Sequence, residues 1–264
     1  MIAENLHTIL SKLPSGVSLV AVSKFHPVSS LMEAYAAGQR VFAESRPQEL
    51  AAKVPQMPAD VQWHFIGHLQ TNKLKLVLPH VSLVQSVDSL HLLEAISAWA
   101  VANNRIVDVL LELHLGAEET KQGFTEEEII SIVSCAHTHA EIASASLRPL
   151  PFVMPGYDRA SPLGPSLLRG RGWPRISSCV SAPPTENSGI RIRGLMGMAT
   201  NTDDMAVVEM DFERIEGSYK RIQAMNLPDF DILSIGMSGD WPLAVKHGAT
   251  MVRIGTDIFG PREY

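Results

Sequence analysis

Short apolar runs alternate with longer amphipathic segments along most of the chain. One run, residues 17–23, is almost continuously apolar, which is typical of a strand buried on both faces. The segments between the runs place apolar residues at helical spacing, as Ile2, Leu6 and Ile9 do at the start. The runs predict strands at 17–23, 40–44, 63–67, 82–87, 107–115, 190–198, 231–237 and 250–255. The intervening segments predict helices at 2–13, 29–37, 48–54, 71–78, 89–101, 125–135, 203–225 and 241–247.

Eight strands that alternate with helices favour a (β/α)8 barrel of the TIM type, in a single domain that spans 1–264. The competing fold is a doubly wound open sheet. Its first turn is usually rich in glycine, whereas the turn here is Lys24-Phe25-His26-Pro27. Helix starts are marked by Asp203 and Asp204 and by a capping box between Thr125 and Glu128.

Residues 137–188 break this alternation. The segment is rich in proline and arginine and has no sustained apolar period, which is typical of loop or disorder. It would form an irregular insertion between the helix at 125–135 and the strand at 190–198, on the barrel face away from the expected site. We favour a tolerated or aberrant surface insertion over a lid or a partner-binding segment, because loop closure costs grow slowly with length.

Composition narrows the function classes. The 264 residues carry a net charge of −6 without a basic stripe, which argues against nucleic acid as a partner. Cys135 and Cys179 have no metal-ligand spacing and fit reduced thiols. No apolar stretch has the length of a membrane span, and the start of the chain lacks the basic region of a signal peptide, so we expect a cytoplasmic protein.

The candidate chemistry lies at the ends of the first and last strands. Lys24 follows the first, and Arg253, Gly255 and Thr256 end the last. A lysine that can form an imine, a cation, and glycine and hydroxyl groups for a phosphate are what pyridoxal phosphate requires. The seventh strand adds Ser238 and Gly239, in the region where barrels often bind phosphate.

Other strand ends carry weaker candidates. Ser45 follows the second strand, His64 lies in the third and Met196 in the sixth. A histidine inside an apolar strand is more often a packed or hydrogen-bonded core residue than a ligand, and a methionine is more often plain core. No metal-binding, nucleophile-elbow or P-loop motif is found, so we expect neither a metal nor those chemistries.

Five motifs then make a family resemblance specific. The chain resembles the pyridoxal phosphate homeostasis protein family, which is similar in fold to the N-terminal barrel of alanine racemase. The family often has FGEN where this chain has Phe-Ala-Glu-Ser at 42–45, so the contact expected from Ser45 is in doubt. The motifs are VAVSK (20–24), WHFIGHLQTNK (63–73), EETKQGF (118–124), RIRGLMGMAT (191–200) and LSIGMSGDWPLAVKHGATMVRIGTDIFG (233–260).

The resemblance implies specific roles. Lys24 would hold the cofactor as an internal aldimine, Arg253 would face the pyridine nitrogen, and Ser238, Gly255 and Thr256 would take the phosphate. An arginine there leaves the nitrogen unprotonated and the ring a poor electron sink. We therefore expect a non-catalytic carrier or buffer of pyridoxal phosphate, monomeric or weakly dimeric, with apoenzymes that use the cofactor as partners.

Two alternatives come from other classes. One is an amino-acid racemase, which needs a base on each face of its planar intermediate. In alanine racemase the second base is a tyrosine from a separate β domain, which we do not expect here because the sequence ends shortly after Thr256. The other is an interaction protein that uses the segment 137–188.

Overall fold

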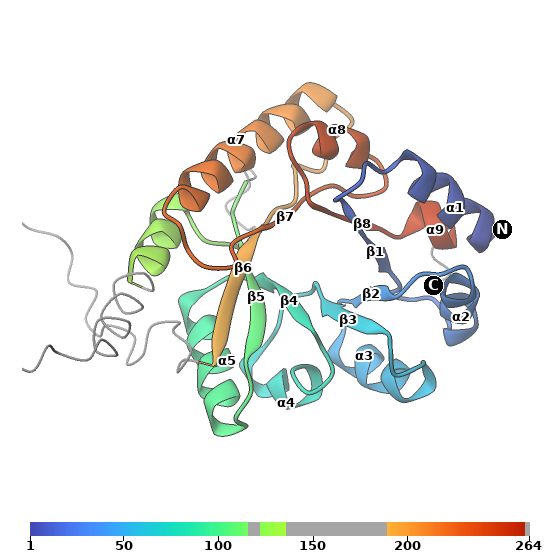
Figure 1. Cartoon of the computed structure of the whole chain (residues 1–264), viewed down its shortest axis with the longest axis horizontal. Coiled ribbons are helices and arrows are strands. Elements are labelled where there is room, and N and C mark those ends of the chain that lie inside the picture. The colour runs from blue at the N-terminus through green and yellow to red at the C-terminus, as the bar shows by residue number, and fades with distance from the viewer. Residues whose placement is uncertain (116–121, 136–188, 262–264) are drawn as a thin grey trace, which may run out of the picture.

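The computed structural model describes residues 1–115, 122–135 and 189–261, so the predicted insertion at 137–188 lies outside the described residues. Eight parallel strands pair in sequence order and close into a barrel through β1 and β8 (Figure 1). The predicted (β/α)8 architecture is confirmed. The strands are β1 (Ser18–Val22), β2 (Val41–Glu44), β3 (Gln62–Phe65), β4 (Leu83–Val87), β5 (Val107–Glu112), β6 (Ile190–Met196), β7 (Ile232–Ser234) and β8 (Met251–Ile254).

Helices surround the barrel close to where the pattern predicts them. The predicted helix at 71–78 consists of a 3-10 turn followed by a single α-helical turn, and a short helix at the end of β8 is an addition to the prediction. The labelled helices are α1 (Ile2–Lys12), α2 (Val28–Ala36), α3 (Pro47–Lys53), η1 (Val54–Gln56), η2 (Thr71–Lys73), α4 (Leu74–Val77), α5 (Leu90–Ala102), α7 (Met205–Gln223), α8 (Trp241–Lys246) and α9 (Thr256–Phe259). A further helix is described at 126–135.

Both predicted helix starts are capped, but at α7 the cap is Asp204, and Asp203 lies before the helix. Asp204 accepts a hydrogen bond from the backbone N–H of Ala206 at 3.0 Å. Thr125 and Glu128 form a reciprocal capping box, in which each side chain accepts from the backbone N–H of the other, at 2.9 and 3.2 Å. These bonds satisfy amide groups that the first helical turn leaves without a partner.

Side chains alternate between the two faces of each strand, and this divides the apolar residues into two groups. Leu19 and Ala21 of β1 pack into the main core beneath the surrounding helices, whereas Val20 faces a small cluster inside the barrel with Leu110 and Met251. Successive side chains of a strand point to opposite faces, so an almost continuous apolar run is what a barrel strand requires. This double burial explains why β1 was readable from the sequence.

A close approach between β6 and β7 depends on Gly194. Its φ is +153°, and a Cβ at this position would lie 1.7 Å from the carbonyl oxygen of Ile232. The pairing of β5 with β6 also changes register here, because Val109 is opposite Ile192 while Leu110 is opposite Gly194. Only glycine fits both the conformation and the space.

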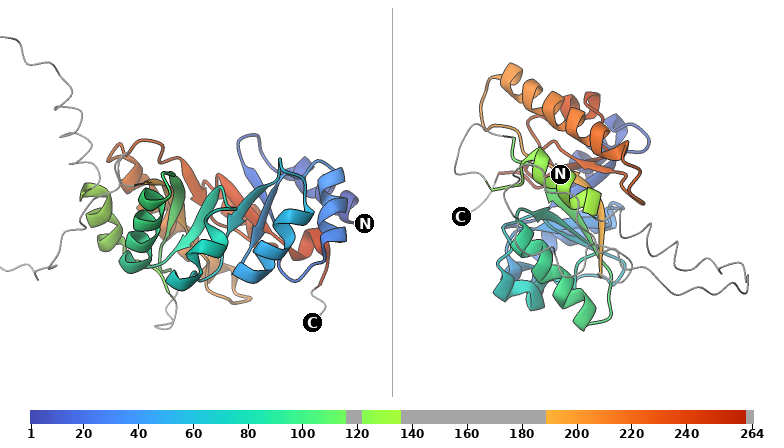
Figure 2. Two further views of the ribbon diagram at one scale, coloured as in Figure 1. Left: turned by 90° about the horizontal axis from the view of Figure 1, so that it is seen from below. Right: turned by 90° about the vertical axis from the view of Figure 1, so that its left-hand side faces the viewer.

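The helix at 126–135 lies beside α7 (Figure 2). Arg221 of α7 makes two hydrogen bonds of 2.6 Å to the carboxylate of Glu126, and Ser218 donates to the same group at 2.8 Å. These contacts fix the start of the helix against the barrel. Within the described ranges, no helix has both the length and the apolar character needed to cross a membrane.

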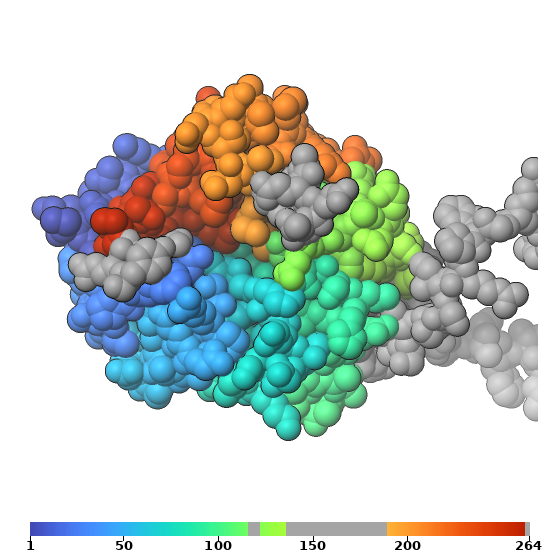
Figure 3. All heavy atoms as spheres, turned by 180° about the vertical axis from the view of Figure 1, so that it is seen from behind, coloured from blue at the N-terminus to red at the C-terminus, as the bar shows by residue number. Residues whose placement is uncertain are grey.

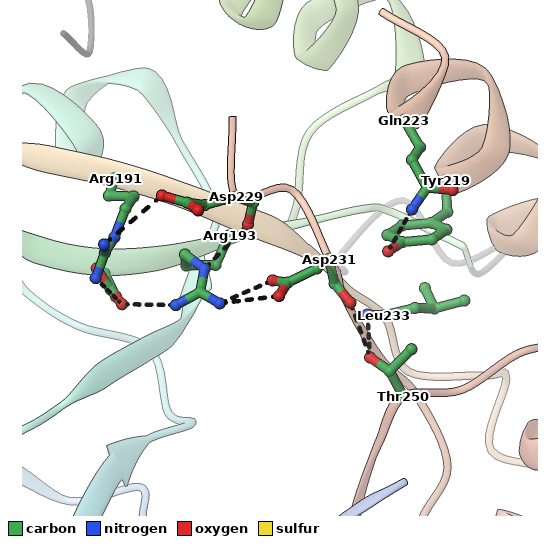
Figure 4. A network of polar contacts seen from close by, with 9 residues as sticks. Arg191, Arg193, Tyr219, Gln223, Asp229, Asp231, Leu233 and Thr250 are labelled. Carbon is green, nitrogen blue, oxygen red and sulfur yellow. Dashed lines mark hydrogen bonds and ion pairs between the residues drawn. The ribbon is translucent and has the colours of Figure 1, made fainter. Parts of the chain in front are cut away.

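A set of charged residues lies at the end of the barrel where the strands begin (Figure 4). We call Asp108, Arg191, Arg193, Asp229 and Asp231 the base network. Arg193 bonds to both Asp108, at 3.1 Å, and Asp231, at 2.8 Å, while Arg191 pairs with Asp108 at 2.8 Å. The network ties the starts of β5, β6 and β7 together.

Candidate functional site

A pocket of about 220 Å³ opens where β1, β6, β7 and β8 end. It brings together residues that the sequence analysis singled out at separate strand ends. The barrel closes by pairing β1 with β8, so Lys24 and Arg253 line the same pocket although they lie near opposite ends of the sequence. Figure 3 shows the face opposite to Figure 1, where the last segment (red) lies between the first (blue) and the residues around β6 (orange). The predicted residues in the lining are Lys24, Met196, Ser238, Gly239, Arg253, Gly255 and Thr256.

Arg253 supplies a buried positive charge to the pocket. Its side chain donates to the carbonyl and hydroxyl oxygens of Ser234, both at 2.7 Å, and to the carbonyl oxygen of Gly197 at 2.8 Å. All these acceptors are uncharged, and Nε makes no hydrogen bond to any described residue. Burial lowers the pKa of Arg253 to about 10, so the guanidinium stays charged at neutral pH. The pocket therefore has a buried cation that makes no ion pair with a described carboxylate, although the charges of Glu112 and Asp240 favour its protonated form.

The backbone on both sides of Lys24 is held by a buried set of charges. We call Glu44, Glu49 and Lys53 the mouth network; Lys53 lies 2.7 Å from both carboxylates. Lys53 also donates to the carbonyl oxygen of Ser23 at 2.8 Å, and Glu49 accepts from the N–H of Phe25 at 2.7 Å. The residues before and after Lys24 are thus fixed by side chains of β2 and α3.

The mouth network also stabilises an unusual backbone conformation. Phe25 has a φ of +69°, in the left-handed region that residues other than glycine rarely adopt. The carboxyl of Glu44, which is fully buried, accepts from Ser23 at 2.6 Å, and burial raises its pKa while Lys53 opposes the rise. The sharp turn after β1 directs the chain away from the strand, so Lys24 stays at the pocket.

Hydroxyl and backbone donors line the side formed by β7 and β8. Ser238 and Gly239 come from the loop after β7, and Gly255 and Thr256 from the end of β8. Ser238 accepts from the N–H of Asp257 at 3.4 Å, which joins the two segments. A Cβ at Gly255 would lie 3.1 Å from the carbonyl oxygen of Val22, so glycine lets β8 and β1 approach here. Such uncharged donors can hold an anionic group.

His64 and Ser45 are not part of the lining of this pocket. His64 is buried in the barrel interior, where its Nδ1 accepts from Gln85 at 2.8 Å, and burial lowers its pKa to about 4. Gln85 in turn accepts from Ser234 at 2.7 Å, and Ser234 accepts from Arg253. His64 thus begins a hydrogen-bonded chain that supports Arg253 from below. A cofactor contact of His64 or Ser45 stays a prediction.

The sequence analysis did not single out the apolar part of the lining. Val22, Ile66, Met198 and Met237 line the pocket beside Met196. Met198 and Met237 are each 40% exposed, so thioether side chains stand at the opening. Polarizable, flexible methionines adapt to a flat ring. The position of these residues just beyond strand ends is the sequence signal that could have identified them.

Among the described residues, no group of His, Cys, Asp and Glu could hold a metal ion.

The sequence of this chain is similar to those of known proteins. Residues 1–147 match the family model of the alanine racemase N-terminal domain. The pyridoxal phosphate homeostasis protein of Vibrio alginolyticus is 30% identical over 96% of this chain and 90% of its own length.

Solved structures agree with the sequence comparison. PipY of Synechococcus elongatus, whose structure has PLP (pyridoxal phosphate) bound, is 31% identical with a TM-score of 0.72 over 98% of this chain and 100% of its own. Alanine racemase from E. faecalis, at 17% identity, shares the fold with a TM-score of 0.64 over 98% of this chain and 57% of its own. The barrel, its pocket and these relatives together show that the chain belongs to the pyridoxal phosphate homeostasis protein family.

Proposed function

We propose that this protein binds pyridoxal phosphate in the 220 Å³ pocket and carries or buffers it rather than using it for catalysis. One observation supports this most. Lys24 and the buried cation of Arg253 line the same pocket, with uncharged hydrogen-bond donors beside them. When bound, pyridoxal phosphate supplies an aldehyde that combines with primary amines. Lys24 is the amine that lines the pocket.

The other lining residues fit the remaining parts of the molecule. Arg253 donates hydrogen bonds but cannot accept a proton, so it would hold a pyridine nitrogen in the unprotonated state. Ser238 and Thr256 would donate to the phosphate, with backbone N–H groups of the same two loops. Met196 and Ile66 supply apolar surface for the ring.

The same residues argue against strong catalysis. A pyridine ring whose nitrogen is unprotonated withdraws electrons weakly. It therefore stabilises little of the negative charge that forms when a proton is removed from an amino acid. The two tyrosines among the described residues, Tyr35 and Tyr219, belong to α2 and α7 and do not line the pocket. The pocket therefore offers Lys24 without an opposing tyrosine among the described residues.

Replacing Lys24 tests the proposal. The parent protein is expected to show visible absorbance and to retain the cofactor after borohydride reduction, whereas Lys24→Ala should lose both, because the attachment point is gone. Lys246→Ala, on the exposed surface of α8, is the matched control and should behave as the parent. Retention of a borohydride-trapped cofactor in Lys24→Ala would place the attachment on another lysine.

The carrier role has a separate measurement. Alanine and serine incubated with the parent protein in heavy water should show no appreciable exchange of the α-hydrogen. Rapid exchange that disappears in Lys24→Ala would overturn the carrier role in favour of a racemase or a related enzyme.

A further inference from the structure

A second cavity, of about 210 Å³, adjoins the first where β3, β4 and β5 end. The two share Ile66 and Met198 in their linings, so these side chains form a common wall. The second cavity contains neither Lys24 nor Arg253, and its polar residues have no part in the function proposed above. Its chemistry therefore needs its own explanation.

Glu112 is the most unusual residue of this cavity. It is only 8% exposed, lines the cavity, and its carboxyl makes no hydrogen bond or ion pair with any described residue. Burial raises its pKa to about 7, with Asp88 adding to the rise and Arg253 and His68 opposing it. A buried carboxyl that lacks donors is costly, and such groups usually have a partner. The partner is expected to come from a bound molecule.

The serine hydroxyls and the histidine at this end of the barrel already make contacts within the protein. Ser86 donates to the carbonyl oxygen of Gly67 at 2.6 Å, and Ser89 donates to Asp88 at 3.0 Å. His68 uses Nδ1 in a contact of 2.8 Å with the other carboxylate oxygen of Asp88. The lining therefore offers the carboxyl of Glu112 and the hydroxyl of Ser86 as acceptors, whereas the amide of Gln122 can both donate and accept. A ligand that satisfies Glu112 and Ser86 has to supply the protons.

The rest of the cavity is apolar and small. Leu113, Leu115, Ile66 and Met198 surround the polar part. A short aliphatic body fits such a lining, and a carboxylate beside it favours a cationic head over a hydroxyl. An anionic ligand would face the carboxyl of Glu112, and Asp88, which contacts the lining residue His68 at 2.8 Å, would add to the repulsion.

We propose that this cavity is a binding site for a small molecule with a primary ammonium group and a short apolar body, in which Glu112 accepts hydrogen bonds from the ammonium. The site goes beyond the cofactor function. Its common wall with the first pocket would place the bound amine next to the cofactor pocket, in a protein that holds an aldehyde there.

The test uses n-propylamine as the probe, with n-propanol and propionate as neutral and anionic controls of similar size. The full chain is first treated with borohydride, so that any cofactor is fixed covalently and the amine cannot attach to it. Mass spectrometry of this sample shows whether a cofactor has been trapped. It therefore tests the proposed cofactor function independently of amine binding. Binding is followed by the amide NMR signals of Ser86 and Leu113.

Propylamine should shift these two signals in a saturable manner, whereas propanol and propionate should not. The ammonium stays protonated up to about pH 10, as in lysine, while Glu112 ionises around pH 7. Affinity should therefore rise about tenfold between pH 6 and pH 8, because the ionised fraction of Glu112 rises about that much. Asp88, His68 and Arg253 face Glu112 and set the midpoint of the rise.

Glu112→Gln should weaken propylamine binding at pH 8 about tenfold or more and remove its pH dependence. Glu94→Gln, an exposed position on α5, is the matched control and should leave both unchanged. Equal binding by Glu112→Gln and the parent, tighter binding of propionate, or shifts confined to other residues would each overturn the proposal. Amine binding in a sample without trapped cofactor would support the site and contradict the cofactor function alone.

Discussion

The mouth network and the base network contain the same kinds of ion pair in opposite environments. Lys53 and Glu44 are 2.7 Å apart with side chains 7% and 0% exposed, whereas Arg193 and Asp231 are 2.8 Å apart with side chains 23% and 63% exposed. The distances are nearly equal, so distance does not distinguish the two networks. The networks differ in their exposure to water. Water screens an exposed ion pair, whereas a buried charge depends on its partner to offset the cost of burial.

The two networks also differ in what they hold. The mouth network bonds to the backbone of Ser23 and Phe25, on either side of Lys24. The base network joins charged side chains at the strand starts, with one bond from Arg193 to the backbone of Asp229 (Figure 4). Both cavities lie at the opposite ends of the strands. A change in the first should alter stability and the pocket together, while a change in the second should alter stability slightly and leave the pocket intact.

Lys53→Met should give the largest effect. It leaves the buried Glu44 carboxyl with Ser23 as its hydrogen-bond donor, and breaking a buried pair in this way costs about 3–5 kcal/mol of unfolding free energy. The loss should shrink as the pH falls, because protonation of Glu44 removes the unpaired charge. Urea unfolding at pH 8 and pH 5 measures both effects.

A matched control and a rescue sharpen this result. Lys75→Met, at an exposed position of α4, should change the unfolding free energy by less than about 0.5 kcal/mol. Adding Glu44→Gln to Lys53→Met should restore part of the loss by removing the buried charge. A loss for Lys53→Met as small as that of the control would contradict the contrast between the networks.

Glu112→Gln should give an effect of intermediate size, and one that depends on pH. The pKa of this acid is raised from 4.5 to about 7 on folding, so its contribution is fully present below pH 4.5 and is lost as the pH rises through 7. The loss amounts to at most about 3 kcal/mol. Glu112→Gln should therefore flatten the fall in stability between pH 5 and pH 8. Parallel curves for parent and variant would show that Glu112 titrates normally.

Asp231→Asn should give the smallest effect. It removes one carboxylate from Arg193, which keeps its bond to Asp108, and the lost partner is well exposed. We expect a loss of unfolding free energy below about 1 kcal/mol, reduced further at high salt. Cofactor retention should not change. A loss comparable to that of Lys53→Met would show that exposure does not separate the two networks.

The sequence predicted the barrel because each strand is buried on both faces and so appears as an apolar run. It also located Lys24 and Arg253, because both stand at the ends of such runs. It could not predict the contact of Gln85 with Ser234, which depends on the positions of strands on different sides of the barrel. Lys53 is a further example, because a lysine at the end of a helix is normally expected in solvent.

The second cavity was only partly visible from the sequence. His68 lies within the family motif at 63–73, whereas Glu112 and Asp88 lie in none of the five motifs. The pairing of His68 with Asp88 arises because neighbouring parallel strands end at the same rim. The pattern of a single strand gives no information on which rim residues become neighbours, so such a pair has to be read from the fold.

The pairing of β1 with β8 has a consequence for the folding pathway. Lys24 and Arg253 meet in one pocket only after the barrel closes, and contacts between distant parts of a chain form late because their loop entropy has to be overcome first. In a partly folded chain in which β1 and β8 are not paired, the lining residues of the pocket are divided between the two unpaired strands. Ligand binding across the seam would favour the closed state by mass action. The concentration of free ligand would then influence the fraction of chains in which the barrel is closed.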